Sequence, residues 1–175
     1  MTHDLVARRW IDLLGLHPHP EGGWYVETWR ASESCSDDTL PARYDGSRSC
    51  GTAIYYLLAE GVFGALHRLQ SDEVWHHYSG DPVEMLQLRP DGSVLRVLLG
   101  PDVANGEQPQ VVVPKGTWQG VRIVPLGRRS LLGCTVAPGF DFADFEMARR
   151  DDLVERWPDL SDEIASLTHE ESRTA

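Results

Sequence analysis

Residues 64–80 of the chain read GALHRLQSDEVWHHYSG, a β-like stretch in which His67 and Glu73 lie six residues apart. Alternate side chains of a strand share a face, so if Glu73 points inward, Trp75 and His77 point inward too. His67 precedes this strand closely enough for a hairpin-like bend to bring it opposite Glu73. An imidazole and a carboxylate are costly to bury without a ligand, water or mutual hydrogen bonds. This stretch therefore predicts one wall of a small-molecule site on a β-scaffold.

Short β-like runs continue on both sides of this stretch, and turn dipeptides such as Asp91-Gly92 and Asn105-Gly106 separate them. Strands are expected at residues 24–29, 49–59, 64–68, 73–78, 82–88, 94–99, 110–113, 120–125 and 131–136. Many short strands at near-regular spacing predict an antiparallel sandwich or barrel. The segment 31–47 is polar and has no clear pattern, so we expect a mobile loop that could cover the site.

Helices are expected at both ends of the chain. Apolar residues recur at helical spacing across residues 3–14, and Gly15 follows as a stop signal. Residues 142–150 and 161–167 read as short helices, with Ser161 as the N-cap of the second. The segments between these ends supply the strands.

The composition limits the class of protein. With 175 residues, 41% of them hydrophobic, the chain can bury one good core, and two full domains would be crowded. A net charge of -11 argues against a nucleic-acid surface, because phosphate binding needs a clustered positive face. No apolar run approaches the ~20 residues of a membrane helix, and the N-terminus lacks the apolar core of a signal peptide. Three cysteines without zinc spacing fit a reducing compartment. We therefore expect one domain spanning residues 1–175, in the cytoplasm, with no nucleic-acid or membrane partner.

The spacing of these residues resembles the cupin signature. The first cupin motif is a glycine, His-x-His, a glutamate four residues on and a later glycine. Here His67 and Glu73 stand in register, and Leu69 occupies the second histidine position. The second motif runs Pro-x-Gly-x-x-His, and residues 114–119, PKGTWQ, place Gln119 at its histidine. Gln119 follows the tight turn and is expected to begin another strand of the same sheet as Glu73.

The chain is more closely similar to the branch called cupin family 5, which has no agreed reaction. The blocks that carry this resemblance are HPHPEGGWYVETWR, TAIYYLL, HRLQSDEVWHHYSGDPVEMLQL, VVPKGTWQG and LLGCTVAPGFDFADFEMA, which together span roughly residues 16–148. The resemblance implies an all-β double-stranded β-helix, the cupin jelly roll, with a core at about 16–148 and helical ends at 3–14 and 142–167. Sugar epimerases, metal dioxygenases and seed storage proteins share this architecture.

The resemblance also implies a homodimer, since this branch commonly dimerises. The run Tyr55-Tyr56-Leu57-Leu58 is apolar on both faces of its strand. A strand washed by solvent on one face would alternate with polar residues, so we expect a subunit interface at this run.

A metal site would depart from the usual cupin pattern. Typical cupin metals use three imidazoles and a carboxylate, whereas the matching positions here hold His67, Leu69, Glu73 and Gln119. Leucine cannot ligate, and a glutamine carbonyl is a poor ligand for the softer divalent ions. We therefore expect no required cofactor. A divalent metal, if one binds, would use His67, Glu73, Gln119 and, from the same face as Glu73, His77.

Without a metal, His67 is the candidate general base or acid, and Glu73 is its orienting or proton-sharing partner. The unperturbed imidazole pKa of ~6.5 lies near working pH, which suits histidine to this task. Sugar epimerases on the same scaffold use a histidine for proton abstraction beside a carbonyl, which this site could imitate. The alternative is a satisfied buried pair that only lines a binding pocket.

Other residues could contact a ligand. Glycines after Glu21 permit close backbone approach, tryptophans can stack on a sugar or flat ring, and an arginine can pair with a carboxylate or phosphate. The ligand-binding candidates are His77, Gln119, Trp75, Glu21, Arg68 and Trp118. His17 and His19 could sit at the pocket mouth, whereas Cys50 and Cys134 read as small core residues.

We predict a cupin-type protein that binds a small polar, carbohydrate-like metabolite, with epimerase- or isomerase-like proton transfer through His67. Two other classes stay open. One is a metal-dependent oxygenase or lyase, and the other is a non-catalytic metabolite-binding cupin.

Overall fold

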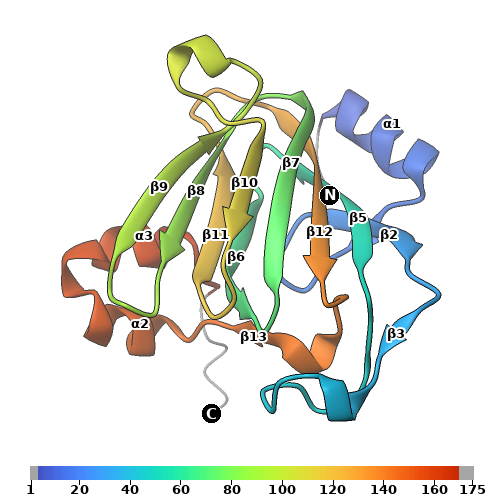
Figure 1. Cartoon of the computed structure of the whole chain (residues 1–175). Helices are drawn as coiled ribbons and strands as arrows, with labels where there is room; N and C mark the ends of the chain where they lie inside the picture. Colours follow the sequence, from blue (N-terminus) through green and yellow to red (C-terminus); the bar gives the residue numbers. More distant parts are fainter. Residues whose placement is uncertain (1–3, 170–175) are drawn as a thin grey trace, which may run out of the picture.

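Two antiparallel sheets packed face to face form the molecule (Figure 1), as seen in a computed structural model that describes residues 4–169. The larger sheet has the order β1 (His17–Pro18), β2 (Trp24–Arg30), β5 (Thr52–Ala59), β12 (Arg129–Ala137), β7 (Asp72–Gly80) and β10 (Gln110–Val113). The smaller sheet has the order β13 (Phe145–Met147), β6 (Phe63–Leu69), β11 (Trp118–Ile123), β8 (Val83–Leu88) and β9 (Val94–Leu99). A separate pair is formed by β3 (Ser34–Cys35) and β4 (Arg48–Ser49).

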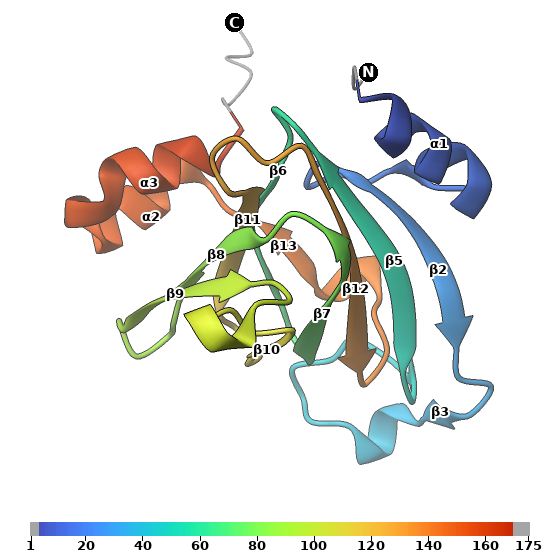
Figure 2. The ribbon, with the colours of Figure 1, turned by 90° about the horizontal axis from the view of Figure 1, so that it is seen from above.

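The chain crosses repeatedly between the two sheets, which is the winding of a double-stranded β-helix. Strand β5 lies in the larger sheet, β6 in the smaller, β7 in the larger and β8 in the smaller. As a result β12 pairs with both β5 and β7, which lie far from it in the sequence. Seen from above, the sheets wrap around a common interior (Figure 2). The prediction of an all-β jelly roll is confirmed.

The interior between the sheets is apolar because strand residues alternate between the inner and outer faces. On β12, Leu132, Cys134 and Val136 are buried, and they alternate with more exposed or smaller neighbours. Tyr56 and Trp75 pack edge to face in the same cluster, with their ring centroids 5.5 Å apart. These side chains fill the middle of the barrel and leave space at one end for a cavity.

Helix α1 (Leu5–Leu14) covers part of the outer face of the larger sheet (Figure 2). Its N-cap Asp4 accepts hydrogen bonds from two backbone N–H groups, and Gly15, at φ 65°, ends the helix as expected. Ala7 packs with Leu57 and Ala59 of β5. The outward apolar residue Leu57 is therefore buried within its own chain. The homodimer stays a prediction, but this part of the run does not require one.

Helices α2 (Arg150–Arg156) and α3 (Ser161–Ser166) pack on the outer face of the smaller sheet (Figure 2). The apolar cluster that joins these helices to the sheet consists of Leu66, Leu86, Leu88, Trp118, Leu153, Trp157, Ile164 and Leu167. No helix within residues 4–169 is long and apolar enough to cross a membrane.

The prediction of a helix at residues 142–150 is wrong. A single 3₁₀ turn occupies 142–144, β13 follows, and α2 begins only at Arg150. Pairing with β6 makes β13 the edge strand of the smaller sheet, because tertiary pairing outweighs a weak local helix preference. The helix near residues 161–167 is confirmed, but Ser161 lies inside it and makes no side-chain cap.

The segment 31–47, expected to be a mobile loop that could cover the site, is a loop that contains the two-residue strand β3 and a 3₁₀ turn at 37–39. Its Tyr44 is buried, and the Tyr44 hydroxyl lies 2.9 Å from Ser71 Oγ. Just beyond it, Arg48 donates two hydrogen bonds to Asp144, of 2.7 and 2.8 Å. The segment does not line the cavity between the sheets.

Candidate functional site

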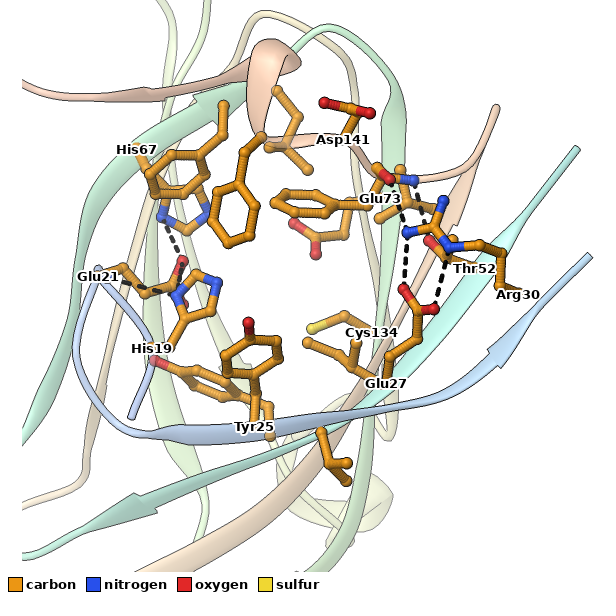
Figure 3. A pocket seen from close by; sticks show the side chains of 18 of the residues that line it. His19, Glu21, Tyr25, Glu27, Arg30, Thr52, His67, Glu73, Cys134 and Asp141 are labelled. Carbon is orange, nitrogen blue, oxygen red and sulfur yellow. Dashed lines mark hydrogen bonds and ion pairs between the residues drawn. The ribbon is translucent and has the colours of Figure 1, made fainter. Parts of the chain in front are cut away.

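A cavity of about 470 Å³ lies between the two sheets (Figure 3). Pockets of several hundred cubic ångströms are typical of small organic ligands. Strands β2, β5, β6, β7 and β12 contribute to its wall, together with β1, the turn after it and the segment 140–145. The cavity therefore joins residues from both sheets and from distant parts of the sequence.

Aromatic side chains make much of the cavity wall. They are Tyr25, Tyr56, Trp75, Phe140, Phe142 and Phe145. Phe145 stacks on the His67 ring at a centroid distance of 5.2 Å, and Tyr25 meets the His19 ring edge to face at 4.6 Å. Such a wall favours a ligand with a flat or apolar body.

His67 projects from β6 of the smaller sheet and is only 3% exposed. Its Nδ1 lies 2.8 Å from the carbonyl oxygen of Ala65. A carbonyl can only accept, so Nδ1 carries the proton and donates it. The other nitrogen, Nε2, then holds a lone pair, and it has no hydrogen-bond partner within residues 4–169. In this tautomer His67 is equipped to act as a base.

Glu21 connects His67 with His19 on one side of the cavity (Figure 3). Its Oε2 lies 3.2 Å from Nδ1 of His67 and 3.4 Å from Nδ1 of His19. The backbone N–H of Glu21 donates to Nδ1 of His19, so that nitrogen is an acceptor and the His19 ring is neutral. The turn after β1 holds this carboxyl in place. A Cβ on Gly22 would come within 2.2 Å of the Phe63 carbonyl oxygen, so only glycine fits beside it.

Glu73 enters the cavity from β7 of the larger sheet, which faces the sheet that carries His67. Gln119 donates a hydrogen bond to Glu73 through its side-chain amide. Trp75 in turn donates from Nε1 to the Gln119 carbonyl at 2.8 Å, which fixes the orientation of the amide. Gln119 thus stands behind Glu73 as a support. It lies in the same sheet as His67 and pairs with it directly across the ladder.

Burial shifts the pKa values of the ionisable groups of the cavity toward their uncharged forms. It raises the pKa of Glu21 from an ordinary 4.5 to about 8, although the Tyr56 hydroxyl opposes the rise. It also raises the pKa of Glu73, while His67 opposes this rise and Glu21 adds to it. Burial lowers the pKa of His67, and it lowers the pKa of His19 to about 4, aided by its histidine neighbours. The short contacts of Glu21 with the two imidazoles are therefore hydrogen-bond contacts between neutral groups near pH 7.

Charged residues appear at the other side of the cavity. Arg30 donates to both carboxylate oxygens of Glu27, at 3.0 and 2.7 Å, and to the carbonyl of Phe140. Both side chains of the Arg30–Glu27 pair are partly exposed. Figure 3 places this pair across the cavity from the group formed by His67, Glu21 and His19.

The structure brings some predicted site residues together and separates others. His67, Glu73, Trp75 and Glu21 all line the cavity, and Gln119 supports it from behind. His77 does not line it. In the ladder His77 lies opposite the buried Leu132, so it is on the same face of β7 as Glu73, as expected. However, His77 lies farther along the strand than Trp75. There its Nε2 lies 3.4 Å from the Asp81 carbonyl.

Arg68 and Trp118 also lie outside the cavity. Arg68 pairs with Glu146 at 2.7 Å, and its guanidinium stands 4.5 Å from the centre of the Trp118 ring. Trp118 belongs to the apolar cluster that joins α2 and α3 to the smaller sheet. Of the cysteines, Cys134 is buried in the cavity wall, whereas Cys50 is exposed and is not the core residue expected.

Sequence reasoning missed three features of the site. It placed His19 only at the pocket mouth, it paired His67 with Glu73 rather than with Glu21, and it assigned Tyr56 to a subunit interface rather than to the cavity. A signal for Tyr56 was present, because Thr52, Ile54 and Tyr56 share one face of β5 by alternation and all line the cavity. The phenylalanine wall at 140–145 had no periodic signal.

The donor set does not fit a typical cupin metal. Leu69 lines the cavity at the second histidine position, and the Gln119 amide is engaged with Glu73 and Trp75. His77, the possible substitute ligand, lies elsewhere. Within residues 4–169 no group of three or more His, Cys, Asp or Glu side chains is arranged to hold a metal ion.

Comparison with known proteins agrees with this architecture. The family described as the cupin superfamily (DUF985) matches residues 8–148. The uncharacterized protein YML079W of Saccharomyces cerevisiae is 29% identical over 160 residues, covering 85% of this chain and 79% of the yeast protein.

Solved structures show the same similarity. A hypothetical protein from Leishmania major superposes with a TM-score of 0.83 and 33% identity, covering 94% of this chain and 99% of that one. Protein SO0799 from Shewanella oneidensis gives a TM-score of 0.83 and 34% identity, covering 94% and 98%. Oxalate decarboxylase from Bacillus subtilis, with a TM-score of 0.52 and 14% identity over 89% of this chain and 38% of its own, shares the fold alone.

The raised pKa of Glu21 predicts a stability that falls as pH rises from 6.5 to 8. Over this range the unfolded chain, with an ordinary glutamate pKa near 4.5, has lost the proton that the folded chain still holds. The folded state thus binds more protons, and the free energy of unfolding decreases with pH by roughly 1–2 kcal/mol across the window. The depressed pKa of His19 acts mainly below about pH 7, where the unfolded chain binds the proton first and falling pH removes stability.

Urea denaturation of the wild type and of Glu21→Gln at pH 6.5 and 8 measures this effect. We expect the free energy of unfolding of the variant to decrease less between pH 6.5 and 8. The decrease that is left comes from Glu73, whose pKa is also raised. Glu84→Gln, a partly exposed carboxylate paired with Arg122, should keep the full decline. An equal slope in wild type and Glu21→Gln would contradict the assignment.

Proposed function

Because the chain belongs to the cupin superfamily (DUF985), matched over residues 8–148, we propose that it binds a small organic metabolite in the barrel cavity and catalyses proton transfer on it. The reaction class is that of an isomerase or epimerase. The observation that carries the proposal is the buried, neutral His67, whose unpaired Nε2 and the facing carboxyl Glu73 flank one cavity. No cofactor is required for this chemistry.

The proposed proton transfer starts at a C–H bond next to a carbonyl. Nε2 of His67 takes the proton, and the electron pair of the C–H bond moves to the carbonyl oxygen as an enolate. Burial raises the pKa of Glu73, which favours the carboxylic acid form, and in that form Glu73 gives its proton to the enolate oxygen. Return of a proton to carbon, on the same or the opposite face, completes an isomerisation or an epimerisation without net gain or loss of protons.

Glu21 and Ala65 position the base in this scheme. Oε2 of Glu21 and the carbonyl oxygen of Ala65 lie 3.2 and 2.8 Å from Nδ1 of His67, and they hold the proton on that nitrogen. When Nε2 gains a proton the ring becomes a cation, and the same two oxygens stabilise it. Aromatic residues around the cavity exclude water from the reacting atoms, which strengthens these interactions.

Solvent-deuterium exchange tests the proposal. Wild-type protein is incubated in deuterium oxide with a panel of ring-bearing carbonyl compounds that have an acidic C–H bond, and exchange is followed by proton NMR. The expected result is deuterium at the carbon next to the carbonyl, above the rate without protein, in at least one compound that binds. Binding without exchange in every compound would favour the non-catalytic metabolite-binding cupin and overturn the catalytic half of the proposal.

A further inference from the structure

Two buried carboxyl groups of the cavity, Glu21 and Glu73, have no arginine or lysine partner within residues 4–169. Both line the cavity and are only 4% and 6% exposed. Arg30 is the single arginine or lysine among the described lining residues. It is paired with Glu27, and this pair lies on the side of the cavity opposite Glu21. The nearest partners of Glu21 and Glu73 are imidazoles, a hydroxyl, an amide and a thiol, all of them neutral groups near pH 7.

We propose that the cavity selects a cationic amine with a flat, apolar body and rejects anions. The inference rests on the proposed function, since it names the ligand class of the same site. An ammonium group that enters beside Glu21 and Glu73 supplies a positive charge that stabilises a buried carboxylate once its proton has left. The rings of Tyr25, Phe145 and their neighbours offer negative faces to a cation and a stacking surface to its apolar body.

An anion meets the opposite environment. A ligand carboxylate or phosphate would lie close to Glu21 and Glu73 and would hold both as acids, with no free cation to pair with it. Among the described lining residues Arg30 alone carries a permanent positive charge, so the anion would have to displace Glu27 from it. This site therefore differs in its ligand preference from one built around arginines that bind carboxylates.

Proton release on binding is the distinctive consequence. A bound ammonium lowers the pKa of the nearest carboxyl, and Glu21, at about 8 in the free protein, holds its proton at pH 7. Binding of an amine at pH 7 should therefore release about one proton per ligand. Binding of a neutral analogue should release none.

Isothermal titration calorimetry with three matched probes tests the inference. The probes are 2-phenylethylamine, 2-phenylethanol and phenylacetate, each measured at pH 7 in two buffers with different ionisation enthalpies. We expect the amine to bind at least about tenfold more tightly than phenylacetate and to release a proton. Glu21→Gln should reduce both the preference and the proton release, and the surface variant Glu84→Gln should change neither.

The possible results separate this inference from the proposed function. Tighter binding of phenylacetate, or amine binding without proton release, would overturn the charge preference and leave proton transfer to the exchange experiment. Absence of binding by all three probes would also overturn it. A selective amine site with no exchange chemistry would leave the ligand class intact and remove only the catalytic proposal.

A second inference concerns two cysteines outside the cavity. Cys35 ends β3, Cys50 follows β4, and their sulfur atoms lie 3.4 Å apart. The pairing explains this proximity: Cys35 lies opposite Arg48, and Cys50 donates its backbone N–H to the carbonyl of Glu33 just before β3, so the two cysteines are diagonal neighbours. Cys50 is exposed and Cys35 is partly exposed, so an oxidant can reach them.

We infer that Cys35 and Cys50 are a disulfide-forming modification site for a peroxide oxidant. One thiolate attacks hydrogen peroxide, which yields a sulfenic acid and one water after protonation. The other thiol then displaces the sulfenic hydroxyl as a second water, so two thiols lose two hydrogens and the peroxide is reduced. The resulting bond would clamp β4, which carries the buried Arg48, to β3.

Intact-protein mass spectrometry after treatment with hydrogen peroxide tests this site. We expect a loss of the mass of two hydrogens, reversed by dithiothreitol, and a Cys35–Cys50 cross-linked peptide after proteolysis. Cys50→Ser should abolish the loss, and Cys134→Ser, which changes a buried thiol, should not. Addition of oxygen atoms to either cysteine without cross-linking would contradict the inference.

Discussion

His67→Gln is expected to lower the rate of protein-catalysed hydrogen exchange by about 10²–10⁴-fold, the usual contribution of a positioned general base. Glutamine keeps much of the side-chain size and polarity, but it has no nitrogen lone pair that can take a proton at neutral pH. The loss should appear in the exchange rate at saturating ligand. Ligand affinity should change less, because the aromatic wall stays in place.

A matched histidine elsewhere provides the control. His76 lies on the same strand as Glu73, one residue beyond Trp75, and its Nε2 contacts the Thr135 hydroxyl rather than the cavity. His76→Gln should leave exchange unchanged. Equal exchange by His67→Gln and wild type would remove His67 from the reaction, whatever the effect on binding.

Arg48→Met is expected to lower the free energy of unfolding by about 3–5 kcal/mol, as when one partner of a buried ion pair is removed. Both side chains of the Arg48–Asp144 pair are nearly inaccessible, and the guanidinium also donates to the carbonyls of Asp45, Gly46 and Ser47. The substitution would leave the Asp144 carboxylate buried without a cation. Urea denaturation at pH 7 measures the loss.

Two further variants show whether burial of the pair is the cause. Arg96→Met breaks an ion pair with Glu163 of similar length but greater exposure, and it should cost only about 0–1 kcal/mol. The double variant Arg48→Met with Asp144→Leu should recover part of the loss, because no unpaired charge remains. A loss in Arg48→Met no larger than that in Arg96→Met would contradict this account.

Strand periodicity allowed most of the fold to be predicted. The expected bounds of residues 94–99 and 110–113 coincide with β9 and β10, and the other expected strands differ mainly at their ends. Alternating apolar residues specify which side of a strand faces the core, and turn dipeptides specify where a strand stops. The region around 142–150 was mispredicted because its partner strand, β6, lies far away in the sequence.

The site could be predicted only in part, because alternation gives the face of a side chain but not its depth along the barrel. His77 illustrates this limit, since it follows the alternation from Glu73 yet lies beyond the buried Trp75. Glu73 and Gln119 were expected on one sheet, and the structure places them on facing sheets, joined by a hydrogen bond.

The partnership of Glu21 with His67 was hidden for a different reason. Glu21 lies in the turn after β1, and its contact with β6 depends on how the two sheets close at that end. No spacing rule connects positions so far apart. The glycines after Glu21 were the useful signal, since the turn packs against the backbone of β6 at Phe63.

A direct measurement of the pKa values of the cavity groups tests the central claim that buried, uncharged acids and bases face each other there. Residue-specific NMR titration would follow the Glu21 carboxyl carbon and the His19 and His67 ring signals in the ligand-free protein, with Glu21→Gln and His19→Gln for assignment. The account predicts a pKa of about 8 for Glu21, about 4 for His19 and below 6.5 for His67. Values near 4.5 for Glu21 and near 6.5 for both histidines would contradict it.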